Sequence, residues 1–265
     1  MASFLSTRPG GIPAVGCTLG FGTPFSAQLM SRVGYDYVLV DMEHNPLSAS
    51  QAGIMTHVVI AASAGKCQPI IRVPSHGVEW IKWALDTGVP GILVPMVASG
   101  AEMESIIQSA VYPPRGQRSF GPTLAAFADL DPAATAAKYR TETSKNVAVI
   151  PMIESAEGLK NAEAICSVDG VTAVFVGPVD LRFSMGLPGG DGSEDVYLDA
   201  LQHVRGICRR LGKPVGIFAA DAEACRKRTS EGFDFIMLPG EAALLVAGAK
   251  ANLTECKKGM RAGKL

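Results

Sequence analysis

The chain has 265 residues, of which 48% are hydrophobic and 18% are charged, and its formal net charge is -1. This length is sufficient for one large hydrophobic core and falls within the size range of a single α/β barrel. No run of basic residues is longer than three, at Arg226, Lys227 and Arg228, so the chain lacks the extended basic segment expected of proteins that bind nucleic acid or an acidic membrane.

The cysteines and the N-terminal segment indicate the compartment. The six cysteines are scattered without a CxxC pair, which favours reduced thiols over a disulfide framework or a zinc site. The first residues, MASFLSTRPGG, contain no continuous apolar segment, and nowhere is there an uninterrupted apolar stretch of about 18 residues. We therefore expect a cytoplasmic protein.

Eight short apolar or β-branched runs predict strands, and helical patterns that often end in glycine separate them. The predicted strands span residues 14–21, 36–42, 69–73, 91–97, 147–153, 173–177, 214–218 and 235–238. Eight strands that alternate with helices predict an α/β fold, a single (β/α)8 TIM barrel that comprises residues 1–265.

A doubly wound sheet is the structural alternative. Its dinucleotide-binding form requires GxGxxG after the first strand, whereas this turn reads GFGTPFSAQ, which lacks the third glycine and places Pro24 where a helix would start. The barrel is therefore preferred. One long irregular segment, residues 112–132, has the character of a lid or a subunit contact.

Charged side chains occur at the carboxyl ends of several predicted strands. In parallel barrels these ends surround the active site, and apolar strands rarely carry charge that has no use or partner. The residues concerned are Asp41, Glu43 and His44 after the second strand, Arg72 at the third, Glu154 at the fifth and Asp180 after the sixth. We expect them to converge on one mouth.

These side-chain types suit metal-assisted chemistry on a 2-oxo acid. Glu154 and Asp180 offer hard oxygen ligands for Mg²⁺ or Mn²⁺, and leave positions open for a chelating substrate. Arg72 offers a permanently charged planar fork for a carboxylate or an enolate oxygen. His44 is a candidate proton shuttle whose tautomer Asp41 could fix.

Simpler roles remain open for each residue taken alone. A carboxylate at a strand end can cap a helix or form a loop ion pair, and Arg72 can simply pair with Asp41 or Glu43. A Schiff-base aldolase would need a lysine on a strand, and no predicted strand contains one. Metal-assisted chemistry is therefore favoured over covalent catalysis.

Several segments together resemble one family. They are VDMEHNPLS (40–48), IIRVP (70–74), LVPMV (93–97), YPPRGQRSFG (112–121), IESAEGLKN (153–161) and VFVGPVDLRFSMG (174–186). In this combination and order the chain resembles the HpcH/HpaI class II, metal-dependent pyruvate aldolases, and the resemblance spans nearly the whole barrel.

The resemblance implies roles for particular residues. Glu154 and Asp180 would bind a divalent cation, Mg²⁺ or Mn²⁺ with Co²⁺ as a further candidate. Arg72 would steady a pyruvate enolate, and His44, backed by Asp41, would carry out acid–base catalysis with a water molecule. The substrate site would further include Met152, Gly177 and Pro178.

The resemblance also implies a homo-oligomer, a hexamer or a trimer. Asp86 looks like the residue that such enzymes insert into a neighbouring subunit's site. The apolar segment EAALLVAGAKA (241–251) suits a C-terminal helix, residues 241–265, that packs on a neighbour. Packing on its own barrel is the alternative.

The implied reaction is retro-aldol cleavage of a 4-hydroxy-2-oxo acid to pyruvate and an aldehyde, and its reverse. One departure is Met152, where many bacterial members have Gln, which leaves the substrate open. Arg182, where Ser is frequent, slightly favours a branch similar to macrophomate synthase that decarboxylates oxaloacetate, although a surface arginine is the simpler interpretation. A catalytically silent barrel that acts as a binding protein is the remaining alternative.

Overall fold

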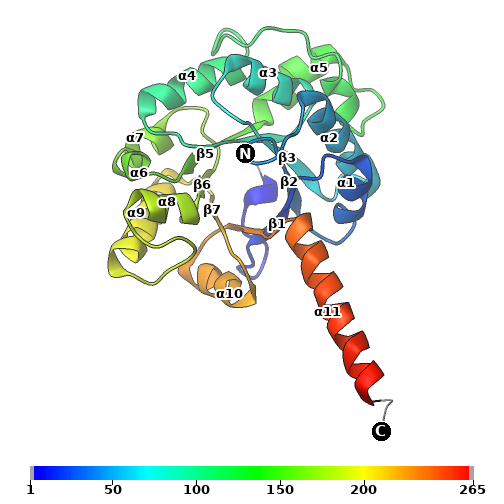
Figure 1. Cartoon of the computed structure of the whole chain (residues 1–265). Helices are drawn as coiled ribbons and strands as arrows, with labels where there is room; N and C mark the ends of the chain where they lie inside the picture. The colour runs from blue at the N-terminus through cyan, green and yellow to red at the C-terminus, as the bar shows by residue number, and fades with distance from the viewer. Residues whose placement is uncertain (1–2, 263–265) are drawn as a thin grey trace.

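Eight parallel strands form a closed barrel in chain order in the computed structural model, which describes residues 3–262 (Figure 1). Gly16 of β1 lies opposite Tyr37 of β2 on one side and Met237 of β8 on the other, which closes the sheet. The strands are β1 (Ala14–Leu19), β2 (Tyr37–Asp41), β3 (Gln68–Arg72), β4 (Gly91–Val94), β5 (Ala148–Ile153), β6 (Val174–Val176), β7 (Val215–Phe218) and β8 (Phe235–Leu238). The predicted barrel is confirmed, and the doubly wound sheet is excluded because such a sheet is open.

The helices lie outside the strands, except for α11, which projects from the barrel (Figure 1). They are α1 (Pro24–Met30), α2 (Ala49–Ser63), α3 (Val78–Asp86), α4 (Gly100–Ala110), α5 (Ala136–Thr141), α6 (Ala156–Lys160), α7 (Ala162–Ser167), α8 (Pro178–Ser184), α9 (Asp195–Leu211), α10 (Ala222–Glu231) and α11 (Glu241–Ala262). Short 3-10 helices are η1 (Ser3–Leu5), η2 (Ala125–Ala128) and η3 (Thr143–Asn146). None of these helices is long and apolar enough to cross a bilayer.

Local sequence signals explain where the first helices begin. Pro24 occupies the first turn of α1, as expected, and the Thr23 hydroxyl accepts a hydrogen bond from the amide of Ser26 at 3.1 Å. Ser48 and Gln51 form a reciprocal capping box at the start of α2. The turn after β1 is therefore built to start a helix.

The hydrophobic core has two parts. One lies inside the barrel and includes Leu39, Met152 and Phe175, and it contacts Leu5 of η1. The other lies between the strands and the surrounding helices. Because the interior is filled by side chains, the barrel has no open channel, and space for a ligand is left at the carboxyl ends of the strands.

The irregular segment from 112 to 132 does not cover the barrel mouth. Its Arg118 is buried, donates a hydrogen bond to Asp86 of α3 at 2.6 Å and lies 4.5 Å from the ring centroid of Tyr112. η2, within this segment, contacts α2 and α5. None of its residues lines the cavity at the mouth, so within one subunit the expected lid is not formed. A subunit contact stays a prediction.

The C-terminal helix does not pack on its own barrel, which was the alternative to an exchanged helix. After Glu241, the side chains of α11 up to Arg261 are exposed, and residues 263–265 of the predicted segment 241–265 lie outside the described residues, as do residues 1–2 of the predicted domain. Leu245, Leu253 and Met260 share one face at helical spacing. An apolar face is thus left without a partner in the single chain.

Candidate active site at the mouth of the barrel

A cavity of about 420 Å³ opens at the carboxyl ends of the strands. Most of the predicted site residues line it, together with apolar side chains that include Leu93, Phe175 and Phe218. The predicted residues in its lining are His44, Arg72, Met152, Glu154, Gly177, Pro178 and Asp180. The expected convergence on one mouth is therefore observed for these residues.

Arg72 and Asp41 form a buried ion pair at the adjacent ends of β3 and β2. Arg72 Nε donates to Asp41 Oδ1 at 2.7 Å, and Nη2 donates to Oδ2 at 2.8 Å. Burial alone would raise the pKa of Asp41, but the bonds from Arg72 outweigh it and leave that pKa below its ordinary value. Asp41 therefore stays ionised and fixes the plane of the guanidinium.

The structure corrects the expected contact between Asp41 and the His44 imidazole. Asp41 Oδ1 lies 3.5 Å from the backbone amide of His44, and its side-chain partners are Arg72 and Asn45. The His44 side chain is 64% exposed, and its Nε2 lies 3.5 Å from Glu43 Oε2. Glu43 is thus the carboxylate nearest to the imidazole, because the turn after β2 directs the Asp41 side chain toward β3.

Glu43 is a site residue that the sequence did not single out for a role. Its Oε2 lies 3.1 Å from Arg72 Nη1, at ion-pair distance but without hydrogen-bond geometry. Burial raises its pKa, although Arg72 and His44 act in the opposite direction. The only signal in the sequence was its place between Asp41 and His44 at a strand end.

Glu154 is almost completely buried at the end of β5. Its Oε1 accepts the backbone amide of Met96 at 2.6 Å, and Met96 has a φ of 53°, in the left-handed region. Burial raises the pKa of Glu154 to about 7; the Met96 amide opposes this, while Glu43 and Asp180 add to it. The orienting role of Met96 is invisible in sequence because it is played by the backbone.

Asp180 enters the cavity from the first turn of α8. Pro178 begins this helix directly after β6, and Gly177 allows the close approach of β6 to Glu154. A Cβ at position 177 would lie 2.3 Å from Glu154 Oε2. The Asp180 side chain is exposed, and no described residue donates a hydrogen bond to its carboxylate. Its position therefore depends on the backbone of α8.

The charge at this mouth is unbalanced. Among the described residues, the carboxyl groups of Asp41, Glu43 and Glu154 surround the guanidinium of Arg72, and Asp180 lies close enough to Glu43 and Glu154 to raise the pKa of both. The described residues contain no group of three or more His, Cys, Asp or Glu arranged to hold a metal. A cation at Glu154 and Asp180 would thus have two protein ligands and positions open to other oxygen donors.

Residues 19–247 match the family described as HpcH/HpaI aldolase/citrate lyase. The chain belongs to this family. The resemblance drawn from the sequence is confirmed. Five of the six segments that suggested it contribute residues to the cavity, and the sixth, 112–121, does not.

Two relatives and two solved structures give the range of similarity. The chain is 34% identical over 248 residues to the hydroxypyruvate/pyruvate aldolase of Rhizorhabdus wittichii, which covers 93% of this chain and 95% of that protein. It is 31% identical over 252 residues to the 4-hydroxy-2-oxovalerate aldolase of Rhodococcus jostii, with 94% and 93% covered. A family member from Burkholderia cenocepacia superposes with a TM-score of 0.85 at 28% identity, over 94% and 96% of the two chains. Macrophomate synthase superposes with a TM-score of 0.80 at 25% identity, over 93% and 86%.

Asp86 lies away from the mouth of its own barrel. At the end of α3, its Oδ1 accepts the hydrogen bond from Arg118, and the side chain is part of a mainly apolar surface hollow with Ile54, Trp83 and Phe127. Within one subunit it therefore cannot take part in the site. Its predicted insertion into a neighbour's site, by analogy with other members of the HpcH/HpaI family, stays a prediction.

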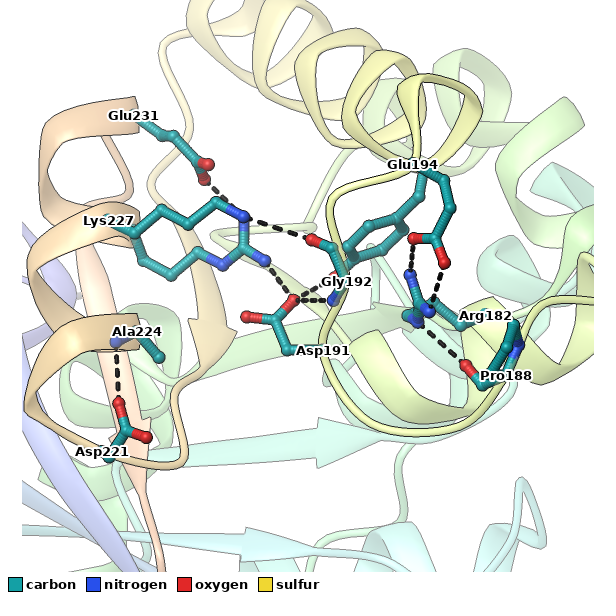
Figure 2. A network of polar contacts seen from close by, with 11 residues as sticks. Arg182, Pro188, Asp191, Gly192, Glu194, Asp221, Ala224, Lys227 and Glu231 are labelled. Atoms are coloured by element: carbon teal, nitrogen blue, oxygen red, sulfur yellow. Dashed lines mark hydrogen bonds and ion pairs between the residues drawn. The ribbon is translucent and has the colours of Figure 1, made fainter.

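The interpretation of Arg182 as a surface residue is wrong. Its side chain is 3% exposed and forms an ion pair with Glu194 (Figure 2). The partner is 12 positions away in an irregular segment, so local sequence gave no indication of the pair.

Proposed function

We propose that the protein is a carbon–carbon lyase that cleaves a 4-hydroxy-2-oxo acid to pyruvate and an aldehyde, and that catalyses the reverse addition. The observation that carries this proposal is the grouping of Glu154, Asp180 and Arg72 around one cavity at the barrel mouth. The aldolases of Rhizorhabdus wittichii and Rhodococcus jostii, to which the chain is similar over nearly its whole length, support the same reaction class.

Glu154 and Asp180 fit a divalent metal site. Both offer hard oxygen atoms, and the excess of carboxylates over basic groups at the mouth is relieved by a cation. We propose Mg²⁺ or Mn²⁺, with Co²⁺ as a further candidate. When bound there, such an ion supplies the Lewis acidity that polarises the keto and carboxylate oxygens of a 2-oxo acid.

Arg72 and His44 have distinct proposed roles in bond cleavage. His44, through a water molecule, takes the proton of the 4-hydroxyl group as the C3–C4 bond breaks. The O–H electron pair forms the aldehyde carbonyl, the C3–C4 electron pair moves toward the keto group, and the Arg72 guanidinium stabilises the developing enolate oxygen. Asp41 holds that guanidinium in place through two hydrogen bonds. The exposed His44, beside Glu43, passes a proton through a water molecule to C3 of the enolate and completes pyruvate.

Decarboxylation of oxaloacetate is the second candidate reaction. It generates the same enolate, with CO₂ in place of the aldehyde as the leaving group. The structural similarity to macrophomate synthase over 93% of the chain is the observation that keeps this candidate. Met152, which lines the cavity with an apolar side chain, is compatible with either substrate.

We further propose that the protein is a homo-oligomer, a trimer or a hexamer, in which α11 packs on a neighbouring subunit. The support is the apolar face of α11, which the single chain leaves exposed, and the exposed Phe25 and Leu29 on α1. Asp86 would then be available to a neighbour's site.

The test is a metal-dependent product assay. Metal-stripped protein is incubated with oxaloacetate, and separately with pyruvate and a panel of aldehydes, with and without Mg²⁺ or Mn²⁺. Aldol product that requires the metal supports the lyase, and pyruvate from oxaloacetate alone supports the decarboxylase. Absence of turnover in every mixture, with folded and metal-loaded protein, contradicts both.

A further inference from the structure

Two buried arginines hold the segment between α8 and α9, and the proposed reaction uses neither (Figure 2). Arg182, on α8, donates from Nε to the carbonyl of Pro188 at 3.0 Å and from Nη2 to Glu194 Oε1 at 2.9 Å. Its Nη1 pairs with the other oxygen of Glu194. The Glu194 carboxylate is therefore bound in a bidentate manner by Nη1 and Nη2 of the guanidinium, a strong geometry for such a pair.

Arg228, on α10, holds the same segment from the opposite side. It pairs with Asp191 and, through Nη1, with Glu231 Oε2 at 2.6 Å. Both guanidinium groups lie over the ring of Tyr197, whose centroid is 5.0 Å from the guanidinium carbon of Arg182 and 5.8 Å from that of Arg228. The two arginines are therefore similar in burial, pairing and stacking.

The segment is shaped around Arg182 in particular. A Cβ at Gly192 would lie 1.7 Å from Arg182 Nη1, so only glycine fits the observed path of the chain. The amide of Leu187 also returns to the carbonyl of Arg182 at 2.9 Å. α8 and the segment after it are thus fixed to one another by both the side chain and the backbone of this residue.

Arg182 differs from Arg228 in what its helix carries. α8 has only seven residues, and Asp180 precedes Arg182 by two positions. Since no described residue holds the Asp180 carboxylate, the placement of α8 decides where it lies. At the end of α8, the Ser184 hydroxyl accepts the amide of Ala156 at 2.8 Å, two residues after Glu154. α8 is therefore anchored at one end to the Glu154 segment and through Arg182 to the segment 187–194.

We propose that Arg182 is a positioning residue, which through Glu194 holds α8 so that Asp180 faces Glu154. This proposal rests on the proposed metal site at Glu154 and Asp180. The ion pair is weak evidence for stability as such, because desolvation of the buried Arg182 offsets much of its attraction to Glu194, whose side chain is 38% exposed and screened by solvent. If the pair positions α8, its loss weakens metal binding; if it only stabilises the fold, its loss lowers the thermal midpoint and leaves metal binding unchanged.

The experiment measures Mn²⁺ affinity of the full-length protein by electron paramagnetic resonance, in parallel with the thermal midpoint. Arg182→Met is the test variant, and Arg228→Met is the matched control, because it removes a buried guanidinium that contacts the same segment but belongs to α10 and not to α8. We expect Arg182→Met to weaken Mn²⁺ binding on the order of 10- to 100-fold, as for other outer-shell residues. Arg228→Met should lower the thermal midpoint while the Mn²⁺ affinity stays within about threefold, on the same reasoning.

Wild-type protein and Asp180→Asn are measured in the same way, so that an error in the proposed metal site can be distinguished from an error in the proposed role of Arg182. If wild-type protein does not bind Mn²⁺, or if Asp180→Asn binds it equally well, the metal site itself is wrong. If wild type binds and Asp180→Asn does not, but Arg182→Met binds like wild type or both Met variants weaken binding equally, the positioning role is overturned. Glu194→Gln, which keeps the size of the side chain and removes its charge, replaces Arg182→Met should that variant not fold, with the same direction expected.

Discussion

The Glu154 carboxyl is subject to two opposing demands on its protonation. Burial favours its neutral, protonated form, whereas binding of a metal ion requires its ionised form. Its raised pKa, about 7, means that the folded, metal-free protein holds the proton more tightly than the unfolded chain does. The contribution of Glu154 to the free energy of unfolding of the metal-free protein is therefore fully present below pH 4.5, the ordinary pKa of the group. This contribution is lost as the pH rises through about 7. A cation would reverse this preference by favouring the ionised form.

We therefore predict that Glu154→Gln stabilises the metal-free protein at pH 8 relative to wild type, and that the difference shrinks toward pH 5. The rise of the pKa from 4.5 to about 7 sets an upper bound of about 3 kcal/mol on this term. Urea unfolding in the presence of a chelator at both pH values measures it. A difference between the two proteins that does not change with pH would contradict the assignment.

For single residues, the sequence predicted the site where a side chain makes the contact and did not predict it where a backbone group makes the contact. Arg72, Glu154 and Asp180 were recognised because charged residues at apolar strand ends are unusual. The amide of Met96 was not, because a left-handed φ at a non-glycine residue leaves no mark in the side-chain pattern. The same limit hid that Asp41 contacts the amide of His44 and not its ring.

At the scale of elements, the junction of β6 and α8 determines how closely the two proposed metal ligands approach. Gly177 is required there because the Cβ of Glu154 lies 2.7 Å from where its own Cβ would be. That atom belongs to the stem of the side chain, so rotation of the carboxylate alone cannot relieve the contact.

Gly177→Ala should accordingly reduce metal-dependent turnover on the order of 100-fold, the cost of displacing a catalytic group by about 1 Å. Gly206→Ala is a suitable control, because it lies within α9 and its added Cβ would meet only Arg210 Nη1, at 3.9 Å. Steady-state rates on the substrate identified by the product assay give the comparison. Equal rates for the two variants would show that the Glu154 carboxylate tolerates displacement.

Element boundaries were predicted less well than element types. The apolar run 91–97 predicted a strand to residue 97, but β4 ends at Val94 because the chain turns at Met96 to reach Glu154. The grip of Arg182 on Glu194 lay beyond prediction for a different reason. It joins a helix to an irregular segment, for which sequence periodicity carries no information.

For the whole molecule, the alternation of strands and helices was sufficient to predict the closed barrel, because each apolar strand except β8 is followed by a segment that packs on the barrel. The direction of α11 was not predictable from composition alone. An apolar helix is equally suited to its own barrel or to a neighbour; the arrangement of the chain excludes its own barrel (Figure 1), and packing on a neighbour stays a prediction.

If α11 packs on a neighbouring subunit, Leu245→Asp should lower the mass of the assembly, because it places a charge on the apolar face. Lys250→Glu, on another face of the same helix, should leave the mass unchanged. Light scattering after size-exclusion chromatography measures both. A wild-type monomer, or a Leu245→Asp variant of unchanged mass, would refute the arrangement.

The distribution of the cysteines makes it possible to label α11 selectively. Four thiols are buried, and burial raises the pKa of Cys17 and of Cys67 to about 12, which keeps both protonated and inert to alkylation. Cys256 is the one cysteine of the described chain that is exposed, and it lies on the same face of α11 as Leu253 and Met260. A maleimide should therefore label Cys256 quickly in a free subunit and slowly in an assembled one. The rate of this labelling reaction therefore measures whether α11 is packed on a neighbouring subunit.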